Sequence, residues 1–315
     1  MFSFLPKKQA VGIEITSSSV RVVALSGGGP KASVLFAKTV DLPWGLVTES
    51  YAAPNIADTD ALSSVLRECL AGLAHLKIRR AALSLPDSIF RVQTLEFDQL
   101  PDKTVEQERL IRWRIQKASA FDIAGSLLRY QFLKRQDTGF TVLACVSKQA
   151  VISQYESIFA GLGLELWSVG LSSFNTLNFY SPYLSRKATV SALAHVAGDS
   201  FTTIITEGGG VRFYRFKEIK KAGAEEGRAR LMRELEDSLH FYTHMDRSQQ
   251  SDIGQLFLTG EPSVFETLAR GFTDKTALEV EALSPSAVLV SSGATAQDGE
   301  LPAVMAAALG AGGAL

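Results

Sequence analysis

The chain has few of the residues that usually carry metal, redox or thiol chemistry. Its 315 residues include two cysteines and four histidines. Cys69 and Cys145 fall in a predicted helix and a predicted strand, where we interpret them as small apolar core residues of a protein from a reducing compartment. His240 and His244 have the i, i+4 spacing of a zinc-binding pair. No HExxH motif and no third ligand accompany them, which favours exposed histidines on a helix.

An excess of charge and a long apolar run are also missing. The formal net charge of −1 argues against nucleic acid as the main partner. No run of about 18 apolar residues occurs, so we predict no membrane-spanning helix. The first residues lack the apolar length of a secretory signal. A hydrophobic fraction of 46% is ordinary for a soluble globular protein, and we expect a cytoplasmic one.

Three common catalytic signatures are absent as well. The sequence has no GxSxG, no Walker motif and no GxGxxG. Their absence argues against a hydrolase of the nucleophile-elbow type, a P-loop NTPase and a Rossmann dinucleotide enzyme. We assign no catalytic residue from the sequence and leave the metal ligands unassigned.

The sequence does contain one pattern that occurs twice. Residues 11–40 and residues 192–219 each read as an apolar strand, a short polar turn, an apolar strand, a triple glycine and a third strand. The offset is constant: from Glu14 to His195 it is 195 − 14 = 181 residues, and the two glycine triplets are separated equally. A strand meander in each half of the chain predicts two pseudo-equivalent lobes that face each other across a cleft, where ligands commonly bind.

The residues around the two repeats complete the predicted organisation. Short strands and helices indicate a compact α+β insert at about residues 80–165. We place the first lobe, which contains this insert, at residues 1–186 and the second lobe at 187–315. At the end of the chain we predict a helix at 303–309 and a loose tail at 310–315.

The clearest amphipathic helix is predicted at residues 103–119. Thr104 and Gln107 have the spacing of a capping box at its start. One side carries the apolar residues and the other the basic ones: Val105, Ile111, Ile115 and Ala118 against Arg109, Arg112, Arg114 and Lys117. The basic side could contact acidic lipid or a partner, but such a pattern favours a solvated helix face.

Three short polar segments are the candidate phosphate- and nucleotide-binding elements. They are the first turn (Glu14, Thr16, Ser17, Ser18 and Ser19), the second turn (Ala197, Gly198, Asp199 and Ser200) and the strand end Gly260–Glu261. Hydroxyls and backbone N–H groups of such turns can hold a phosphate, and an acidic residue at a strand end can hold Mg²⁺ through water. Alone, each segment is typical of an ordinary turn, and the repeat is what suggests that they meet.

Four segments follow the order and motifs of one known family. GIEITSSSVRVVAL at 12–25 resembles the opening GxDIGSSSVKxVEL, and LSLPDSIFRVQTLEF at 83–97 resembles LPDSxVxxRxLxLP. The stretches 111–133 and 142–178 resemble a helix with an Asp-Tyr strand and a segment that ends in GLxpxxvdxxxFAL. Together they resemble the actin-like ATPase superfamily and, within it, the PilM family of type IV pilus assembly proteins. The match extends over most of residues 10–260, and the last three segments are its most specific part.

This resemblance implies the fold class and the ligand. The fold would be α/β, an actin-like (ribonuclease H-like duplicated) two-lobed fold with an α+β insert subdomain. ATP with Mg²⁺ would bind in the cleft between the lobes, at the three polar segments. A cytoplasmic protein of this family would belong to an inner-membrane assembly platform. It would bind, in a groove that involves the insert, the N-terminal peptide of a PilN-like bitopic membrane protein.

The chain departs from the family at the nucleotide site. In the first phosphate motif, Glu14 and Thr16 replace Asp and Gly, and in the second, His195 and Ala197 replace Asp and Gly. In the adenosine motif, Glu261 replaces the second Gly of a Gly-Gly pair. In the insert, Ala120 replaces the Pro of a Pro-Phe pair. A histidine in place of a carboxylate removes charge that holds Mg²⁺, and a side chain in place of Gly adds a Cβ where backbone should approach phosphate. We therefore expect no efficient ATPase activity. Nucleotide binding stays open, because Ser17–Ser19 remain.

Two other functions stay open beside the scaffold of a pilus or related secretion platform. A working ATPase or small-molecule kinase would use the same cleft and would depend on Glu14 as the carboxylate for the metal. The other function is a filament-forming cytoskeletal protein, which nothing in the sequence singles out. Other platform proteins are expected partners, and a homo-oligomer is compatible with each of these functions.

Overall fold

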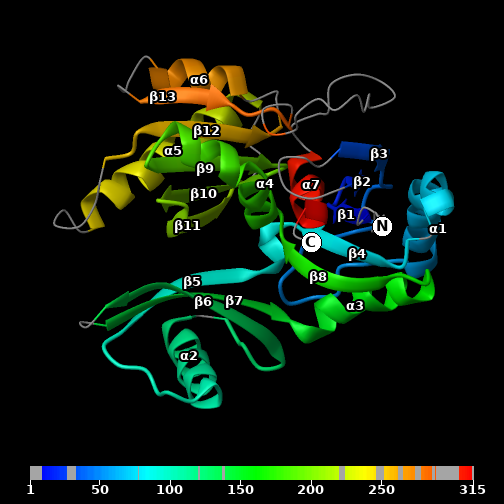
Figure 1. Ribbon diagram of the computed structural model, residues 1–315, viewed down its shortest axis with the longest axis horizontal. Coiled ribbons are helices and arrows are strands. Elements are labelled where there is room, and N and C mark those ends of the chain that lie inside the picture. Colours follow the sequence, from blue (N-terminus) through cyan, green and yellow to red (C-terminus); the bar gives the residue numbers. More distant parts are fainter. Residues whose placement is uncertain are drawn as a thin grey trace, which may run out of the picture.

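Two five-stranded sheets with equivalent strand orders form the two lobes (Figure 1). The first has the order β3-β2-β1-β4-β8 and the second the order β11-β10-β9-β12-β13. In each, the meander is antiparallel and its first strand pairs in parallel with the fourth. The predicted repeat and the two-lobed α/β fold are therefore confirmed. The strands are β1 (Gln9–Ile15), β2 (Ser19–Ser26), β3 (Ser33–Asp41), β4 (Arg80–Leu85), β8 (Glu165–Leu171), β9 (Val190–Ala197), β10 (Ser200–Glu207), β11 (Gly210–Glu218), β12 (Gln255–Gly260) and β13 (Glu279–Ala282).

This computed structural model describes residues 9–26, 33–76, 78–119, 121–136, 139–219, 224–245, 252–261, 265–273, 278–285, 288 and 305–313. The first glycine triplet, Gly27–Gly29, lies outside the described residues, as does Ala120. The second triplet forms the β10–β11 turn, where Gly208 and Gly209 have φ of +56° and +82°. No helix of the described residues is long and apolar enough to cross a membrane.

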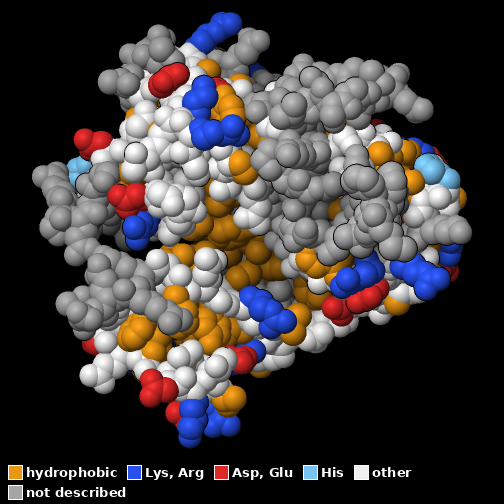
Figure 2. Space-filling view, in the orientation of Figure 1, with side chains coloured by type: hydrophobic (Ala, Val, Ile, Leu, Met, Phe, Trp, Pro, Cys, Tyr) orange, Lys and Arg blue, Asp and Glu red, His pale blue; other side chains and the backbone are white. Residues whose placement is uncertain are grey.

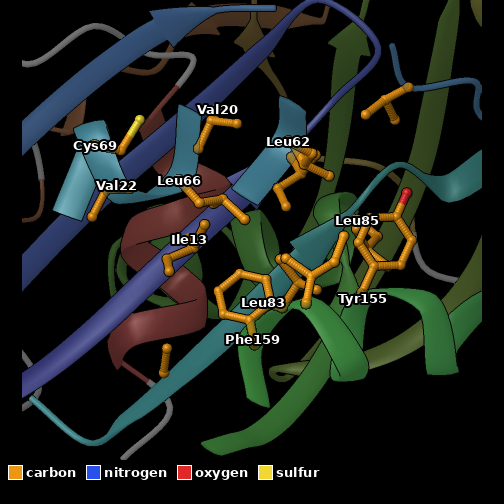
Figure 3. Packing of buried hydrophobic residues seen from close by; sticks show 14 of the residues in the cluster. Ile13, Val20, Val22, Leu62, Leu66, Cys69, Leu83, Leu85, Tyr155 and Phe159 are labelled. Carbon is orange, nitrogen blue, oxygen red and sulfur yellow. The ribbon is translucent and has the colours of Figure 1, made fainter. Parts of the chain in front are cut away.

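Helices α1 (Thr59–Leu70) and α3 (Gln149–Gly161) cover one face of the first sheet. Helix α1 begins at Asp58, whose carboxylate accepts hydrogen bonds from the N–H groups of Asp60 and Ala61, and it continues into a short 3₁₀ helix, Ala71–Leu76. Leu62, Leu66 and Cys69 recur every three or four residues and are buried, as a helix with one apolar face requires. Figure 3 shows them over Ile13 and Val20, with Tyr155 and Phe159 of α3 nearby.

Helix α4 (Ser172–Lys187) lies between the two lobes and was not predicted from the sequence. Leu177, Tyr180 and Leu184 pack against the second sheet, and the helix also contacts α7 (Ala306–Gly313), which lies on the first sheet. Because both flanks are covered, α4 has buried polar residues as well as apolar ones and lacks a simple apolar stripe. Helices α5 (Ala224–Met245) and α6 (Phe265–Thr273) cover the opposite face of the second sheet.

The predicted loose tail from residue 310 is wrong for its first four residues, which belong to α7. A Cβ atom on Gly310 would lie 1.7 Å from the carbonyl oxygen of Asn175, so glycine lets α7 approach α4 backbone to backbone. The Gly- and Ala-rich sequence, which suggested a tail, is instead what close helix packing needs.

The insert is a three-stranded antiparallel sheet, β5-β7-β6, covered on one face by α2 (Thr104–Ala118). Its strands are β5 (Arg91–Phe97), β6 (Ser126–Gln136) and β7 (Gly139–Lys148). Ile111 and Ile115 of α2 are buried as predicted. Val105, 63% exposed, and Ala118, near the two ends of the helix, are not buried.

The predicted capping box at Thr104 is also wrong. Lys103 is the N-cap and has no side-chain capping bond, so Thr104 is already inside the first turn. Gln107 instead donates from Nε2 to the carbonyl oxygen of Pro101 at 2.7 Å. On the basic side, Arg112 is half-buried and donates to Glu108 at 2.9 Å, whereas Arg109, Arg114 and Lys117 are exposed.

Candidate functional site

A cavity of about 550 Å³ lies between the lobes and is lined by all three predicted polar segments. The predicted residues that line it are Glu14, Thr16, Ser17 and Ser18 of the first turn, Ala197, Gly198 and Asp199 of the second, and Gly260 and Glu261. The other two predicted residues do not line it: Ser19 is buried, and the Ser200 hydroxyl donates to the carbonyl oxygen of Ala197 at 3.0 Å. The repeat thus brings together segments that are far apart in the sequence.

The backbone N–H groups of the first turn are all hydrogen bonded within the protein. The N–H of Thr16 donates to the carbonyl oxygen of Ser19 at 2.9 Å. The Thr16 hydroxyl accepts from the N–H groups of Ser18 and Ser19 at 3.3 and 3.0 Å. The remaining N–H, that of Ser17, donates to Oε1 of Glu49 at 2.9 Å. A phosphate would find no free N–H donor in this turn.

Glu49 is a site residue that the sequence analysis missed. It lies in the connector after β3, and its other oxygen, Oε2, accepts from the Ser88 hydroxyl at 3.1 Å. Glu49 therefore joins the first turn to the segment that follows β4. No motif marks it, because the contact exists only once the connector has folded across the end of the sheet.

Glu14, the candidate metal carboxylate, has both oxygens engaged. Oε2 pairs with Nη1 of Arg21 at 2.7 Å, and Oε1 accepts from the Ser172 hydroxyl at 2.7 Å. Glu14 and Arg21 face each other across the β1–β2 ladder, so the hairpin register was the signal that could have revealed Arg21. The pair is nearly buried, with side-chain exposures of 3% for Glu14 and 15% for Arg21.

His195 stands across the cleft from Glu14 and is linked to it through Ser172. The Ser172 hydroxyl has one hydrogen, which goes to Glu14, so Nε2 of His195, 3.0 Å away, is the donor to the Ser172 oxygen. Burial lowers the pKa of His195, although Asp87 and Glu14 act to raise it. A neutral imidazole is therefore favoured here, and a hydrogen-bonded chain from β1 through the start of α4 to β9 joins the two lobes.

A second and larger junction between the lobes is centred on Asp87. Its carboxylate accepts from the N–H and the hydroxyl of Ser173 at the start of α4, and from Thr202 at 2.8 Å and Tyr214 at 2.9 Å. Burial, followed by the charge of Asp87, raises the pKa of Tyr214 well above its ordinary value, which keeps the phenol protonated as a donor. Asp87 belongs to the LPDS motif and connects β4 with β10 and β11.

The cleft residues do not fit a magnesium nucleotide. Both oxygens of Glu14 are occupied, and His195, at the position where the resemblance led us to expect a second carboxylate, is buried and favoured as neutral. Among the described residues, no three His, Cys, Asp or Glu side chains lie close enough to hold a metal ion. Among the described residues that line the cleft, the carboxylates are those of Glu14, Glu49, Asp199 and Glu261, and the one guanidinium is that of Arg21. Such an acidic cleft repels a polyphosphate that brings no cation with it.

The described residues give no support to thiol chemistry or to zinc binding by the histidine pair. Burial raises the pKa of Cys69 to about 11 and that of Cys145 to about 12, so both thiols stay protonated and act as packing residues. His240 and His244 are exposed on α5 and their rings stack with centroids 3.8 Å apart.

An apolar band lies where the insert meets the two lobes, and it is exposed in Figure 2 between these parts. Seven partly buried apolar side chains from the insert, β8, α4 and β11 pack against the core of the first lobe: Val92, Leu127, Cys145, Leu166, Val169, Phe174 and Tyr214. The ring of Phe174 stacks on that of Tyr214 at a centroid distance of 5.4 Å. Strand β8 borders this region as the last strand of its sheet, and within the described part of the chain it pairs only with β4.

Solved structures with a similar fold define the fold class of the chain. The chain is similar over 90% of its length to a Bacteroides thetaiotaomicron protein with actin-like ATPase fold, with 15% identity, 94% of that chain covered and a TM-score of 0.51. It is also similar to a chain of the PilM-PilN type IV pilus biogenesis complex, with a TM-score of 0.80, 20% identity and 98% of both chains covered. The fold is therefore actin-like, and the predicted structural resemblance to PilM is confirmed. No family model and no curated protein sequence matches the chain.

Proposed function

We propose that the protein is a cytoplasmic scaffold of an inner-membrane platform that assembles a type IV pilus or a related secretion system. It binds the N-terminal peptide of a PilN-like membrane protein and does so with a reduced nucleotide site. The observation that carries this proposal is the fold likeness, at a TM-score of 0.80 over 98% of the chain, to a PilM-PilN complex chain. The occupied cleft carboxylate supports the loss of hydrolysis.

The apolar band beside β8 is the best candidate for the peptide groove. An edge strand offers backbone N–H and C=O groups to an extended peptide, while neighbouring pockets accept alternate side chains. Val169 of β8 and Leu127 of the insert both pack, partly buried, against the core of the first lobe, and we assign them to the two sides of the band. A peptide placed here would contact the first lobe and the insert at once, and its apolar side chains would replace water over the band.

The test is calorimetric titration of the purified chain with a synthetic peptide of the N-terminal cytoplasmic segment of the PilN-type protein from the same organism. We expect binding by the wild type and at least tenfold weaker binding by Leu127→Asp and Val169→Asp. Leu35→Asp is the matched control, because Leu35 is 46% exposed on β3, at the opposite edge of the first sheet. Thermal unfolding of each variant shows whether it is folded. Absence of wild-type binding would contradict the proposal.

An ATPase or kinase that uses the interlobe cleft is the second candidate. The cavity of about 550 Å³, lined by both turns, is large enough to favour it. It requires a free carboxylate for Mg²⁺, so Glu14→Ala should abolish any nucleotide binding. Magnesium-dependent ATP binding that is lost in this variant would support an enzyme over a scaffold.

A further inference from the structure

We propose that Glu49 is a built-in ligand of the first turn. Its carboxylate occupies the place where a turn of this kind would hold a phosphate, so the chain itself fills part of its own nucleotide cleft. This inference rests on the proposed reduction of the nucleotide site but not on the peptide partner, and its failure would leave peptide binding untouched.

The first argument is the hydrogen-bond pattern of the turn. Three of its N–H groups are satisfied by Ser19 and by the Thr16 hydroxyl, which leaves one outward donor, the N–H of Ser17. That donor is paired with Oε1 of Glu49 at 2.9 Å. A carboxylate resembles a phosphate in its negative charge and its acceptor oxygens, and hydrogen bonds to a charged acceptor are the stronger kind.

The second argument is that the connector holds Glu49 in place. The N–H of Leu42 donates to the carbonyl oxygen of Ser18 at 2.8 Å, and that of Thr48 donates to Asn55 at 2.7 Å. Val47 is buried in the core of the first lobe and forms an isolated bridge with Ile56. The connector is fixed on both sides of Glu49, so the carboxylate is held close to the turn. Its effective concentration at the Ser17 N–H is therefore high.

The third argument is the charge around the turn. A free phosphate must displace a tethered carboxylate and also approach Asp199 and Glu261, which line the same cleft. Removing Glu49 takes away the tethered competitor and one negative charge together. The exposed Ser17 N–H is then open to a small anion, with the guanidinium of Arg21 in the same cleft.

The experiment is anion rescue, read as the midpoint of thermal unfolding. Glu49→Ala should unfold at a lower temperature than the wild type. Inorganic phosphate should then raise its midpoint by about 2–4 °C more than sodium chloride of equal ionic strength does. The wild type should show no such difference, because its turn is already filled.

Two further variants keep the test decisive. Glu261→Ala removes another cleft carboxylate, one that accepts none of the hydrogen bonds donated by the first-turn N–H groups, and it should show no phosphate-specific rise. Glu49→Gln keeps an oxygen for the Ser17 N–H and should fold even where Glu49→Ala does not, with a smaller rise. Equal phosphate effects in wild type and Glu49 variants, or no effect in any of them, would overturn the proposal.

Discussion

The two turns of the repeat have the same backbone plan but are completed in different ways. The first turn is closed by side chains, the Thr16 hydroxyl within it and the Glu49 carboxylate from outside. The second relies on backbone conformation, with Gly198 at a φ of +56° and open space where its Cβ would be. Duplicated elements can thus keep their geometry while their chemistry diverges, because the turn N–H groups can donate either to a ligand or to a neighbouring side chain.

The largest effect is expected where the two halves are joined. Asp87→Ala leaves the donors of Ser173, Thr202 and Tyr214 without their shared acceptor in a buried site, so we expect a loss of about 3–4 kcal/mol in the free energy of unfolding. Urea unfolding measures it. Asp58→Ala is the control, because it removes only a helix cap at the surface, which should cost about 1 kcal/mol. Equal losses would show that Asp87 is not a junction.

The strand end beside the second turn gives the next largest effect. A Cβ on Gly260, at a φ of +108°, would lie 1.8 Å from the carbonyl oxygen of Val196. Gly260→Ala should therefore destabilise the protein by about 2–4 kcal/mol, because the backbone of the two strands must separate. Gly198→Ala meets no neighbour and should cost only about 1 kcal/mol for its positive φ. The ratio of the two losses, from urea unfolding, tests whether backbone geometry limits this side of the cleft.

A smaller effect is expected at the side-chain-closed turn. Thr16→Val keeps the shape but removes the hydroxyl that accepts from the N–H groups of Ser18 and Ser19, which should cost about 1–2 kcal/mol. Ser17→Ala removes an exposed hydroxyl and should change stability by less than about 0.5 kcal/mol. If the two substitutions were equivalent in chemical unfolding, the Thr16 hydroxyl would not close the turn.

The smallest effect concerns pH. Burial lowers the pKa of His195 in the folded state below its ordinary value of 6.5, so the unfolded chain takes up this proton first as the pH falls. The stability that neutral His195 contributes is therefore present above pH 6.5 and is lost as the pH falls below it. His195→Asn should unfold with a flatter pH dependence in that range. Parallel curves for the two proteins would show that His195 titrates normally.

The repeat could be predicted from the sequence, but much of the cleft could not. Strand meanders leave a local pattern of alternating side chains and glycine turns. Helix α4 was missed because it packs between two sheets and buries polar residues such as Ser173 and Asn175. The Ser17–Glu49 contact joins residues 32 positions apart through a connector without a motif. Arg21 was within reach of prediction, because the register of the first hairpin places it opposite Glu14.

The most direct test of the central claim is calorimetric binding of the PilN-type N-terminal peptide, measured once in EDTA and once with saturating Mg²⁺ and ATP. If Glu49 occupies the first turn and Arg21 engages Glu14, the peptide should have the same dissociation constant in both solutions, and nucleotide alone should give no heat. Peptide binding that occurs only with Mg²⁺ and ATP would contradict the account. Binding would then require a nucleotide in the cleft, which these side chains are proposed to exclude.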